Sequence, residues 1–218
     1  MSEQKFSEEV RCYGEPYWSA ATDHVFIREM VTGELSLDAF RHYLIQDYAF
    51  FRHFTDLIAH AIVHAPEMAQ IHQLSGFLSD VTDGENDYFI RSFAELGVTE
   101  AQYLDPPLNP VMQRFTKVIE QAIERGYHDC LMVLLCAEWV YWSWGDKYRE
   151  CEPKAFYFAE WLKLHNHTGF TKFVSWLRSE ADRLNTLDTA EQARLKEVFR
   201  TCCQFEEDFF TYAYQQGQ

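Results

Sequence analysis

The sequence predicts an all-α fold of about eight helices with no sheet. The 218-residue chain contains only nine glycines and six prolines, fewer than turn-rich sandwiches and barrels need. Apolar residues recur at spacings of three and four, and no segment alternates as a half-buried strand does. A chain of this length buries a large core without disulfide or metal support. We therefore expect a single domain over residues 1–218.

Start and stop signals place the individual helices. A first helix over 16–31 ends before Gly33, and a long helix over 37–64 carries an apolar stripe. Proline, glycine and capping-box patterns delimit the remaining helices, which we place at 66–78, 85–96, 111–125, 128–149, 153–164, 169–185 and 189–214. The 128–149 segment is the most apolar of these, so we expect it to be central.

Charge and composition exclude several classes of protein. The chain has 19 Lys and Arg against 34 Asp and Glu, a formal net charge of −15. Nucleic-acid partners are excluded because phosphate binding requires clustered basic residues. No run of about 18 uncharged apolar residues exists, and the N-terminal segment MSEQKFSEEV lacks an apolar signal core. We expect a cytoplasmic protein with no membrane partner, whose six cysteines are mostly buried thiols.

Asp47 is the one acid within the apolar stripe of the 37–64 helix. The other stripe positions, such as Tyr43, Phe51 and Phe54, are apolar or aromatic. Burial of an unpaired carboxylate costs several kcal/mol. Asp47 is therefore expected to pair inside the bundle or to line a cavity where a ligand supplies donors. A structural ion pair or an exposed side chain is the alternative.

The central helix carries Cys136, Glu138 and Tyr141 among apolar residues. Residues two apart on a helix diverge by about 200° and residues five apart by about 140°, so the three cannot share one face. A buried, unpaired glutamate has a raised pKa, which suits a general acid or base. A glutamate at the edge of a helix interface is the alternative, and a lone buried cysteine is more often inert than nucleophilic.

The last helix places three acids between aromatic residues. Glu206 lies three positions before Phe209 and shares its face, whereas Glu207 and Asp208 are expected to be solvated. Glu206 is therefore the acid expected to point inward. An ordinary acidic solvent face is the alternative.

Histidines are the candidate metal ligands, but we predict no metal site and no cofactor. His60 and His64 are one helical turn apart, and His165 with His167 forms a second pair. No glutamate precedes a histidine by three positions, the spacing that di-iron bundles supply. Hydrogen-bonded or exposed histidines are the expectation.

A motif in the first quarter of the chain is specific to one family. Its positions are Trp18, His24, Phe26, Gly33, Leu35, Phe40, Tyr43, Gln46 and Asp47. This stretch, PYWSAATDHVFIREMVTGELSLDAFRHYLIQDYAFFRHF, resembles the opening of the TenA (thiaminase II) family. Weaker matches follow in family order at 139–141, at 161–170, and at Glu206 with Phe209. The resemblance covers nearly the whole chain.

The resemblance implies a helical fold like that of haem oxygenase, without haem, assembled as a homo-oligomer (a tetramer or a dimer). It also implies hydrolysis of the C–N bond of an aminomethylpyrimidine, or of thiamin, in salvage of the thiamin pyrimidine. On the family pattern Asp47 binds the pyrimidine nitrogens and Glu206 handles protons. Tyr141 and Phe209 match pocket-wall positions, and we add Trp139 to the expected substrate-binding residues.

The chain departs from the family pattern on the central helix. Ala137 stands where the better-known branch has its catalytic cysteine. Cys136 is one residue early, and 100° of rotation points it away unless the helix is irregular. A second branch relies on a carboxylate instead, and Glu138 is expected to need a comparable shift.

Pocket hydroxyls are also missing relative to the family pattern. Phe50 and His165 stand where tyrosines are expected, and Phe115 or a neighbour replaces a third. Each unmade hydrogen bond to a buried ligand group costs about 1 to 3 kcal/mol. We nevertheless expect Phe50, Phe115 and His165 to be among the substrate-binding residues.

These observations favour a TenA-like aminopyrimidine hydrolase with a small-molecule substrate. Asp47 is expected to anchor the ring and Glu206 to protonate the leaving amine, with water or a carboxylate as nucleophile. Glu138 and Cys136 complete the candidate catalytic residues. One alternative is a binding or regulatory protein on the same fold, without chemistry. Another is a redox enzyme related to the pyrroloquinoline quinone synthases (PqqC) or to metal-dependent oxidases.

Overall fold

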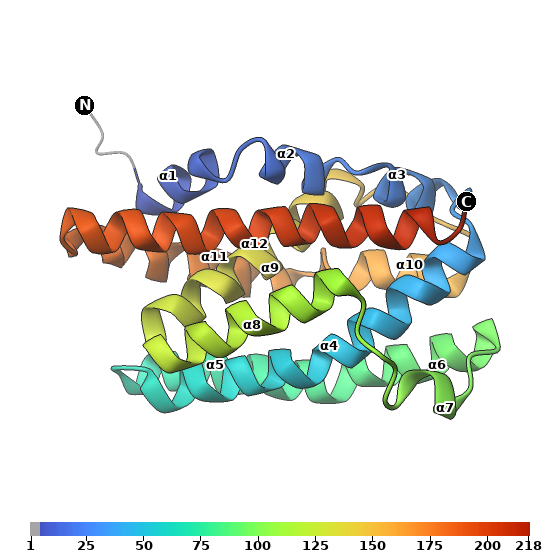
Figure 1. The fold of residues 1–218 in the computed structure, drawn as a ribbon, viewed down its shortest axis with the longest axis horizontal. Helices are drawn as coiled ribbons and strands as arrows, with labels where there is room; N and C mark the ends of the chain where they lie inside the picture. The colour runs from blue at the N-terminus through green and yellow to red at the C-terminus, as the bar shows by residue number, and fades with distance from the viewer. Residues whose placement is uncertain (1–4) are drawn as a thin grey trace.

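The protein is helical throughout the residues that the structure describes. The structure is a computed structural model that describes residues 5–218, and none of these residues is in a strand. The main helices are α4 (Leu37–His64), α5 (Met68–Asp80), α6 (Asn86–Leu96), α8 (Pro110–Arg125), α9 (Tyr127–Lys147), α10 (Phe156–Leu164), α11 (Thr168–Arg183) and α12 (Thr189–Gln215). The predicted all-α fold class is confirmed (Figure 1).

Helix α9 lies at the centre of the bundle, as its apolar sequence predicts. Every residue from Asp129 to Val140 is buried. It packs against α4, α8, α11 and α12, so side chains on each of its faces meet another helix. Buried side chains from α1 to α12 form one contiguous apolar cluster. The single domain over 1–218 stays a prediction, and residues 1–4 of the N-terminal segment lie outside the described residues.

The N-terminal helices differ from the prediction of one helix over 16–31. The structure has three short helices, α1 (Phe6–Tyr13), α2 (Tyr17–Thr22) and α3 (Val25–Thr32). The break between α2 and α3 falls at His24, whose Nδ1 accepts a hydrogen bond from the Phe26 N–H. His24 therefore caps α3. Figure 1 shows the three helices following one another along α12.

The predicted gap between residues 78 and 85 is helical instead. A π-helical segment, η1 (Val81–Glu85), joins α5 directly to α6. π segments are rare and occur frequently at functional sites. Here the segment carries Glu85, which sequence reasoning placed only as the start of a helix.

Two short elements complete the chain, α7 (Glu100–Tyr103) and the 3-10 turn η2 (Leu184–Thr186). No helix within residues 5–218 has the length and apolar character needed to cross a bilayer. The site described next is formed where α4, η1, α8, α9, α10 and α12 converge.

Candidate active site

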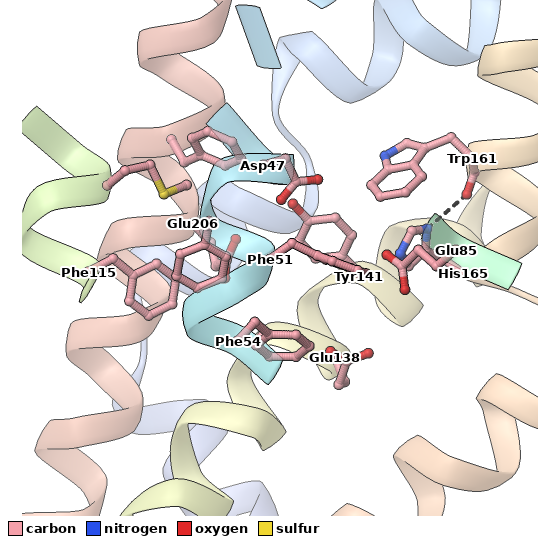
Figure 2. Close-up of a pocket in the computed structure, with 14 residues that line it drawn as sticks. Asp47, Phe51, Phe54, Glu85, Phe115, Glu138, Tyr141, Trp161, His165 and Glu206 are labelled. Carbon is pink, nitrogen blue, oxygen red and sulfur yellow. Dashed lines mark hydrogen bonds between the residues drawn. The ribbon is translucent and has the colours of Figure 1, made fainter. Parts of the chain in front are cut away.

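A pocket lies among six elements near the middle of the bundle. Its empty space is about 530 Å³, counted out to where it opens to solvent. Its lining side chains are Asp47, Phe50, Phe51, Phe54, Glu85, Met112, Phe115, Ala137, Glu138, Tyr141, Trp161, His165, Glu206 and Phe209 (Figure 2). Four carboxyl groups line it, and no lysine or arginine of the described chain does.

Most of the predicted site residues come together in this pocket. They are Asp47, Phe50, Phe115, Glu138, Tyr141, His165, Glu206 and Phe209. Asp47 and Glu206 come from α4 and α12, which are far apart in the sequence. Figure 2 shows the two carboxyl groups on the same hollow. The arrangement places the two acids expected to carry the chemistry in one enclosure.

Cys136 does not line the pocket, which corrects its placement among the catalytic candidates. Its Sγ lies 3.4 Å from the Sγ of Cys203, on the other side of α9. Burial, followed by the hydrogen bonds to Cys202 and Cys203, raises the pKa of the Cys136 thiol. The helix is regular here, so the sulfur stays rotated away from Ala137, which does line the pocket.

Trp139 is likewise outside the pocket, which corrects its placement as a substrate-binding residue. Its ring meets the edge of Trp18, with ring centroids 5.0 Å apart. The Arg178 guanidinium lies 4.3 Å from the Trp139 ring centroid on another side. Both contacts are typical of core packing, and Trp139 joins α9 to α2 and α11.

Glu138 reaches the pocket without any irregularity of α9, contrary to the expected need for a shift. On a regular helix Ala137, Tyr141 and Glu138 span an arc of about 100°. A glutamate is long enough to enter the pocket from the edge of that arc. Burial raises the pKa of Glu138 well above its ordinary value, and the charges of Glu85, Glu206 and Asp47 raise it further.

Asp47 belongs to a chain of hydrogen bonds with two tyrosines. The Tyr43 and Tyr141 hydroxyl oxygens are 2.8 Å apart. Burial raises the pKa of Asp47 to about 7, and its hydrogen bond with Tyr43 opposes that rise. A hydroxyl has one hydrogen to donate. If the Tyr43 hydrogen is directed to Asp47, Tyr141 is the donor in the bond between the tyrosines.

Glu206 is the most buried of the three consecutive acids on α12, and Glu207 and Asp208 are more exposed. Its side chain is buried, with 3% of the residue exposed. Burial raises its pKa well above its ordinary value, and the charge of Asp47 adds to that rise. The raised pKa favours the protonated form of the Glu206 carboxyl, which suits it to give a proton to a ligand.

Glu85 is a pocket acid that sequence reasoning missed. The η1 segment presents its carboxyl beside His165 (Figure 2). Burial, followed by the charge of Asp47, raises the pKa of Glu85 to about 8. The sequence signal was its position just after a glycine at the edge of a predicted helix, which did not indicate burial.

His165 offers the pocket a hydrogen-bond acceptor. Its Nδ1 lies 2.8 Å from the Trp161 carbonyl oxygen, which only accepts. Nδ1 therefore carries a hydrogen. Burial lowers the pKa of His165 to about 3, so the ring is neutral and this is its only N–H hydrogen. Nε2 is then unprotonated and can only accept a hydrogen bond in the pocket. A tyrosine hydroxyl at this position could both accept and donate one.

Trp161 supplies a donor that the sequence did not indicate. The residue is 1% exposed, lines the pocket, and its Nε1–H has no hydrogen-bond partner among the described residues. A buried N–H without a partner costs about 1 to 3 kcal/mol. In Figure 2 this nitrogen lies on the edge of the ring that points towards Asp47. A ring nitrogen of a ligand would satisfy it.

The opposite wall of the pocket is aromatic and apolar. The rings of Phe50 and Phe115 are stacked with centroids 4.8 Å apart, and Phe115 stacks in turn on Phe205 at 5.2 Å. Such a wall suits the face of a flat heterocycle. The wall has no hydroxyl, so the polar contacts of a ligand fall on the acids, Tyr141, Trp161 and His165.

The candidate metal ligands do not converge. Within residues 5–218, no three His, Cys, Asp or Glu side chains are placed to hold a metal ion. His60 and His64 are exposed at the end of α4, and His167 caps α11 through its Nδ1. Only His165 lies in the pocket, and its Nδ1 is engaged by Trp161.

The site is therefore suited to proton transfer on a flat, donor-rich ligand. Its carboxyls include Asp47, with a pKa of about 7, Glu85, with a pKa of about 8, and Glu138 and Glu206, whose pKa values burial raises well above the ordinary value. Pairs of acids with different pKa values in one pocket allow one to accept and another to donate a proton at the same pH.

The chain is similar to several known proteins over most of its length. The chain is 25% identical over 214 residues to an aminopyrimidine aminohydrolase of Bacillus subtilis, covering 97% of this chain and 90% of that protein. It is 23% identical to an aminopyrimidine aminohydrolase of Helicobacter pylori, covering 91% and 93%. A TenA family transcription regulator from Silicibacter sp. TM1040 shares the fold, with a TM-score of 0.86 at 22% identity over 98% of this chain and 99% of that one. The profile of the TENA/THI-4/PQQC family matches residues 14–216, and the chain belongs to that family.

Proposed function

We propose that this protein is a hydrolase that cleaves the exocyclic C–N bond of an aminomethylpyrimidine, in salvage of the thiamin pyrimidine. The observation that carries the proposal is one pocket lined by four carboxyl groups and by no lysine or arginine of the described chain. Such a pocket favours a ligand with several N–H donors or a positive charge. The relatives named aminopyrimidine aminohydrolase support the same reaction class.

In the proposed binding mode the ring lies against the aromatic wall. Asp47 accepts a hydrogen bond from the amino group of the pyrimidine, and Tyr43 orients its carboxylate. The unpartnered Nε1–H of Trp161 donates to a ring nitrogen. These contacts hold the exocyclic carbon between Glu206 and Glu138.

The proposed reaction balances with water as the only co-reactant. Glu206 gives its proton to the exocyclic nitrogen, and the C–N bond breaks with its electron pair going to nitrogen. A water oxygen bonds to the carbon, and the proton it loses passes to Asp47, the acid with a pKa near neutrality, or to Glu138 once the positive charge of the substrate has lowered the pKa of that carboxyl. The products are the hydroxymethylpyrimidine and ammonia. Glu138 takes the place of the thiol that Ala137 lacks, because it lines the pocket beside that position.

Hydrolysis assays on 4-amino-5-aminomethyl-2-methylpyrimidine and on its N-formyl form test the proposal. We expect ammonia or formamide release by the wild type, and a loss of about 100-fold or more in kcat/KM for Asp47→Asn. Asp56→Asn is the matched control, since Asp56 lies on the same helix, pairs with Arg52 and is outside the pocket. No turnover of either compound by folded protein would overturn the proposal.

A binding or regulatory role is the second candidate. The observation that favours it is the loss of hydroxyls and of the thiol from the pocket wall at Phe50, Phe115 and Ala137. The same assay separates the two functions. A rise in melting temperature with the pyrimidine, without turnover, would support binding alone. A redox enzyme is less favoured, because the pocket places only one histidine among its acids.

We also propose a cytoplasmic homo-oligomer, a dimer or tetramer. All six cysteines are free, as a reducing compartment keeps them. Val63 and Met68, at the turn between α4 and α5, are each 76% exposed, and exposed apolar side chains of this kind suit a contact between subunits. Light scattering of the purified protein tests the oligomeric state.

A further inference from the structure

Two polar side chains of the pocket, Glu85 and His165, have no part in the reaction proposed above. Both line the pocket, and Figure 2 shows them together on its side opposite Phe115. His165 follows Trp161 by one helical turn at the end of α10, and the centroids of the two rings are 4.4 Å apart. Around the pocket in Figure 2, Asp47 is thus followed by Trp161, and Trp161 by His165 with Glu85.

Both side chains present hydrogen-bond acceptors to the pocket. The Nδ1–H of His165 is engaged by the Trp161 carbonyl oxygen, and burial keeps the ring neutral, so its Nε2 can only accept. The Glu85 carboxyl has an oxygen that accepts whether or not the group is ionised. Within residues 5–218, no side chain or backbone N–H donates to either acceptor. A ligand that expels water from this corner has to supply hydrogens, because buried polar groups without partners disfavour binding.

The ring contacts of the proposed binding mode decide which part of a pyrimidine reaches this corner. Asp47 binds the amino group, and the unpartnered Nε1–H of Trp161 donates to the ring nitrogen beside the amino-bearing carbon. The next ring atom is C2, the carbon between the two ring nitrogens. Because His165 follows Trp161 around the pocket, the substituent on C2 points at His165 and Glu85. In the thiamin pyrimidine this substituent is a methyl, which has no hydrogen to donate.

We propose that Glu85 and His165 form a specificity site for an amino group on C2, which extends the substrate class to 2-aminopyrimidines. An amino group is close in size to a methyl and lies in the plane of the ring, so it occupies the same space. One of its two hydrogens reaches Nε2 of His165 and the other reaches the Glu85 carboxyl. The inference rests on the proposed function, because it uses the ring orientation that Asp47 sets.

Two compounds of nearly equal shape test the specificity site. They are 4-amino-5-aminomethyl-2-methylpyrimidine and 2,4-diamino-5-aminomethylpyrimidine, which differ only at C2. The amino group also changes the electronics of the ring, so the quantity to compare between variants is the ratio of kcat/KM for the amino compound to that for the methyl compound. The electronic difference is the same in every variant and cancels. The ratio of the two association constants, measured by calorimetry, is a second readout that needs no turnover.

We expect both ratios to fall about tenfold in His165→Phe, which keeps an aromatic ring but has no acceptor. Glu85→Leu, which removes the other acceptor from a different element, should lower them by a similar factor. Glu95→Leu is the matched control, because Glu95 is an exposed acid on α6 outside the pocket. Its ratios should equal those of the wild type.

Unchanged ratios in both pocket variants would overturn the inference, because neither side chain would then contact the substituent on C2. A fall in only one variant would leave a single contact and overturn the paired site. No hydrolysis of either compound by folded wild-type protein would overturn the proposed function, and the association constants would still decide the inference.

Discussion

The buried acids of this protein occur in two contrasting surroundings. Asp129 on α9 is 1% exposed, and its two oxygens accept hydrogen bonds from both terminal nitrogens of the Arg194 guanidinium. Glu138, two and a half turns further along the same helix, is also buried but meets Glu85, Glu206 and Asp47 rather than any cation. One helix therefore carries a paired acid at one end and an unpaired acid in the pocket.

The difference shows what distinguishes a structural acid from a functional one. An acid paired with a guanidinium in the folded protein has no need of a further partner. The acids of the pocket are left with high pKa values because no cation compensates their burial. A cationic ligand with several N–H donors would compensate the burial of these acids. The protein thus keeps an energetically unfavourable arrangement where the ligand binds, as functional sites commonly do.

The largest expected effect is the loss of catalytic activity when the pocket acid Glu206 is replaced by a residue that cannot transfer a proton. For Glu206→Gln we expect kcat to fall by about 100-fold to 10,000-fold, because the amide cannot protonate the leaving nitrogen. The melting temperature should not fall, since the amide removes an unfavourable buried carboxyl. Ammonia release and thermal unfolding measure the two quantities.

Glu207→Gln is the control for Glu206→Gln, because it removes an acid at the next position of α12 that lies outside the pocket. Its activity should match that of the wild type. If Glu206→Gln lost stability but kept its activity, Glu206 would be a structural acid like Asp129, and the proposed contrast between paired and pocket acids would be wrong.

The second largest expected effect is a loss of stability when the ion pair between Asp129 and Arg194 is removed. Asp129→Asn leaves the Arg194 guanidinium without its buried carboxylate, and we expect the free energy of unfolding to fall by about 2 kcal/mol. The value lies below that of a fully buried pair because Arg194 is 32% exposed. Urea unfolding measures it. Glu191→Gln, which removes the more exposed partner of Arg194, should lose less, and turnover should survive in both variants.

The sequence was sufficient for the fold class and for naming three of the four pocket acids, although Glu138 was expected to need a helical shift; for Asp47 and Glu206 it also indicated the inward face. Asp47 stood out because it was the one acid in an apolar stripe, and Glu206 because it shared a face with Phe209. Both inferences depend only on the regular 3.6-residue period of a helix. The long helices α4 and α12 keep that period around both residues, so the faces were predictable.

The remaining parts of the site depend on how the helices pack. Glu85 enters the pocket from a π segment, and no local pattern indicates where a chain of helices departs from the regular period. The rotation of α9 that brings Ala137 and Glu138 inward and turns Cys136 towards Cys203 is set by its neighbours on all sides. An apolar helix buried all round has no face that its sequence marks as outward.

The third prediction concerns the pH dependence of stability at Glu85. Its pKa is about 8 in the folded protein, against an ordinary value of 4.5. The folded state thus binds the proton more tightly than the unfolded state, and Glu85 reduces stability progressively as pH rises from about 4.5 to about 8. For Glu85→Gln we expect a gain over the wild type that grows between pH 5.5 and pH 8.5. The full pKa difference corresponds to about 3 kcal/mol over this range, and the partial solvent exposure of Glu85 reduces the expected growth to about 1 kcal/mol.

Urea unfolding at the two pH values measures the gain of Glu85→Gln. Glu95→Gln is its control, because Glu95 is an exposed acid on α6, and its stability should follow that of the wild type at both values. A gain of equal size at pH 5.5 and pH 8.5 would mean that the Glu85 carboxyl is not held protonated, and the contrast with Asp129 would weaken.

The smallest effect is expected at Glu180, which lies between the two extremes. Glu180 is 7% exposed, but its cation, Arg183, is 52% exposed and 3.1 Å from its oxygen. Its other oxygen accepts a hydrogen bond from the Gln70 amide. Glu180→Gln loses a half-solvated ion pair and can keep an oxygen for Gln70, so we expect a loss of only about 0.5 kcal/mol by urea unfolding. A loss as large as that of Asp129→Asn would show that burial of the acid, rather than burial of its cation, decides the strength of these pairs. In that case the absence of a cation in the pocket would no longer explain why its acids differ from the rest.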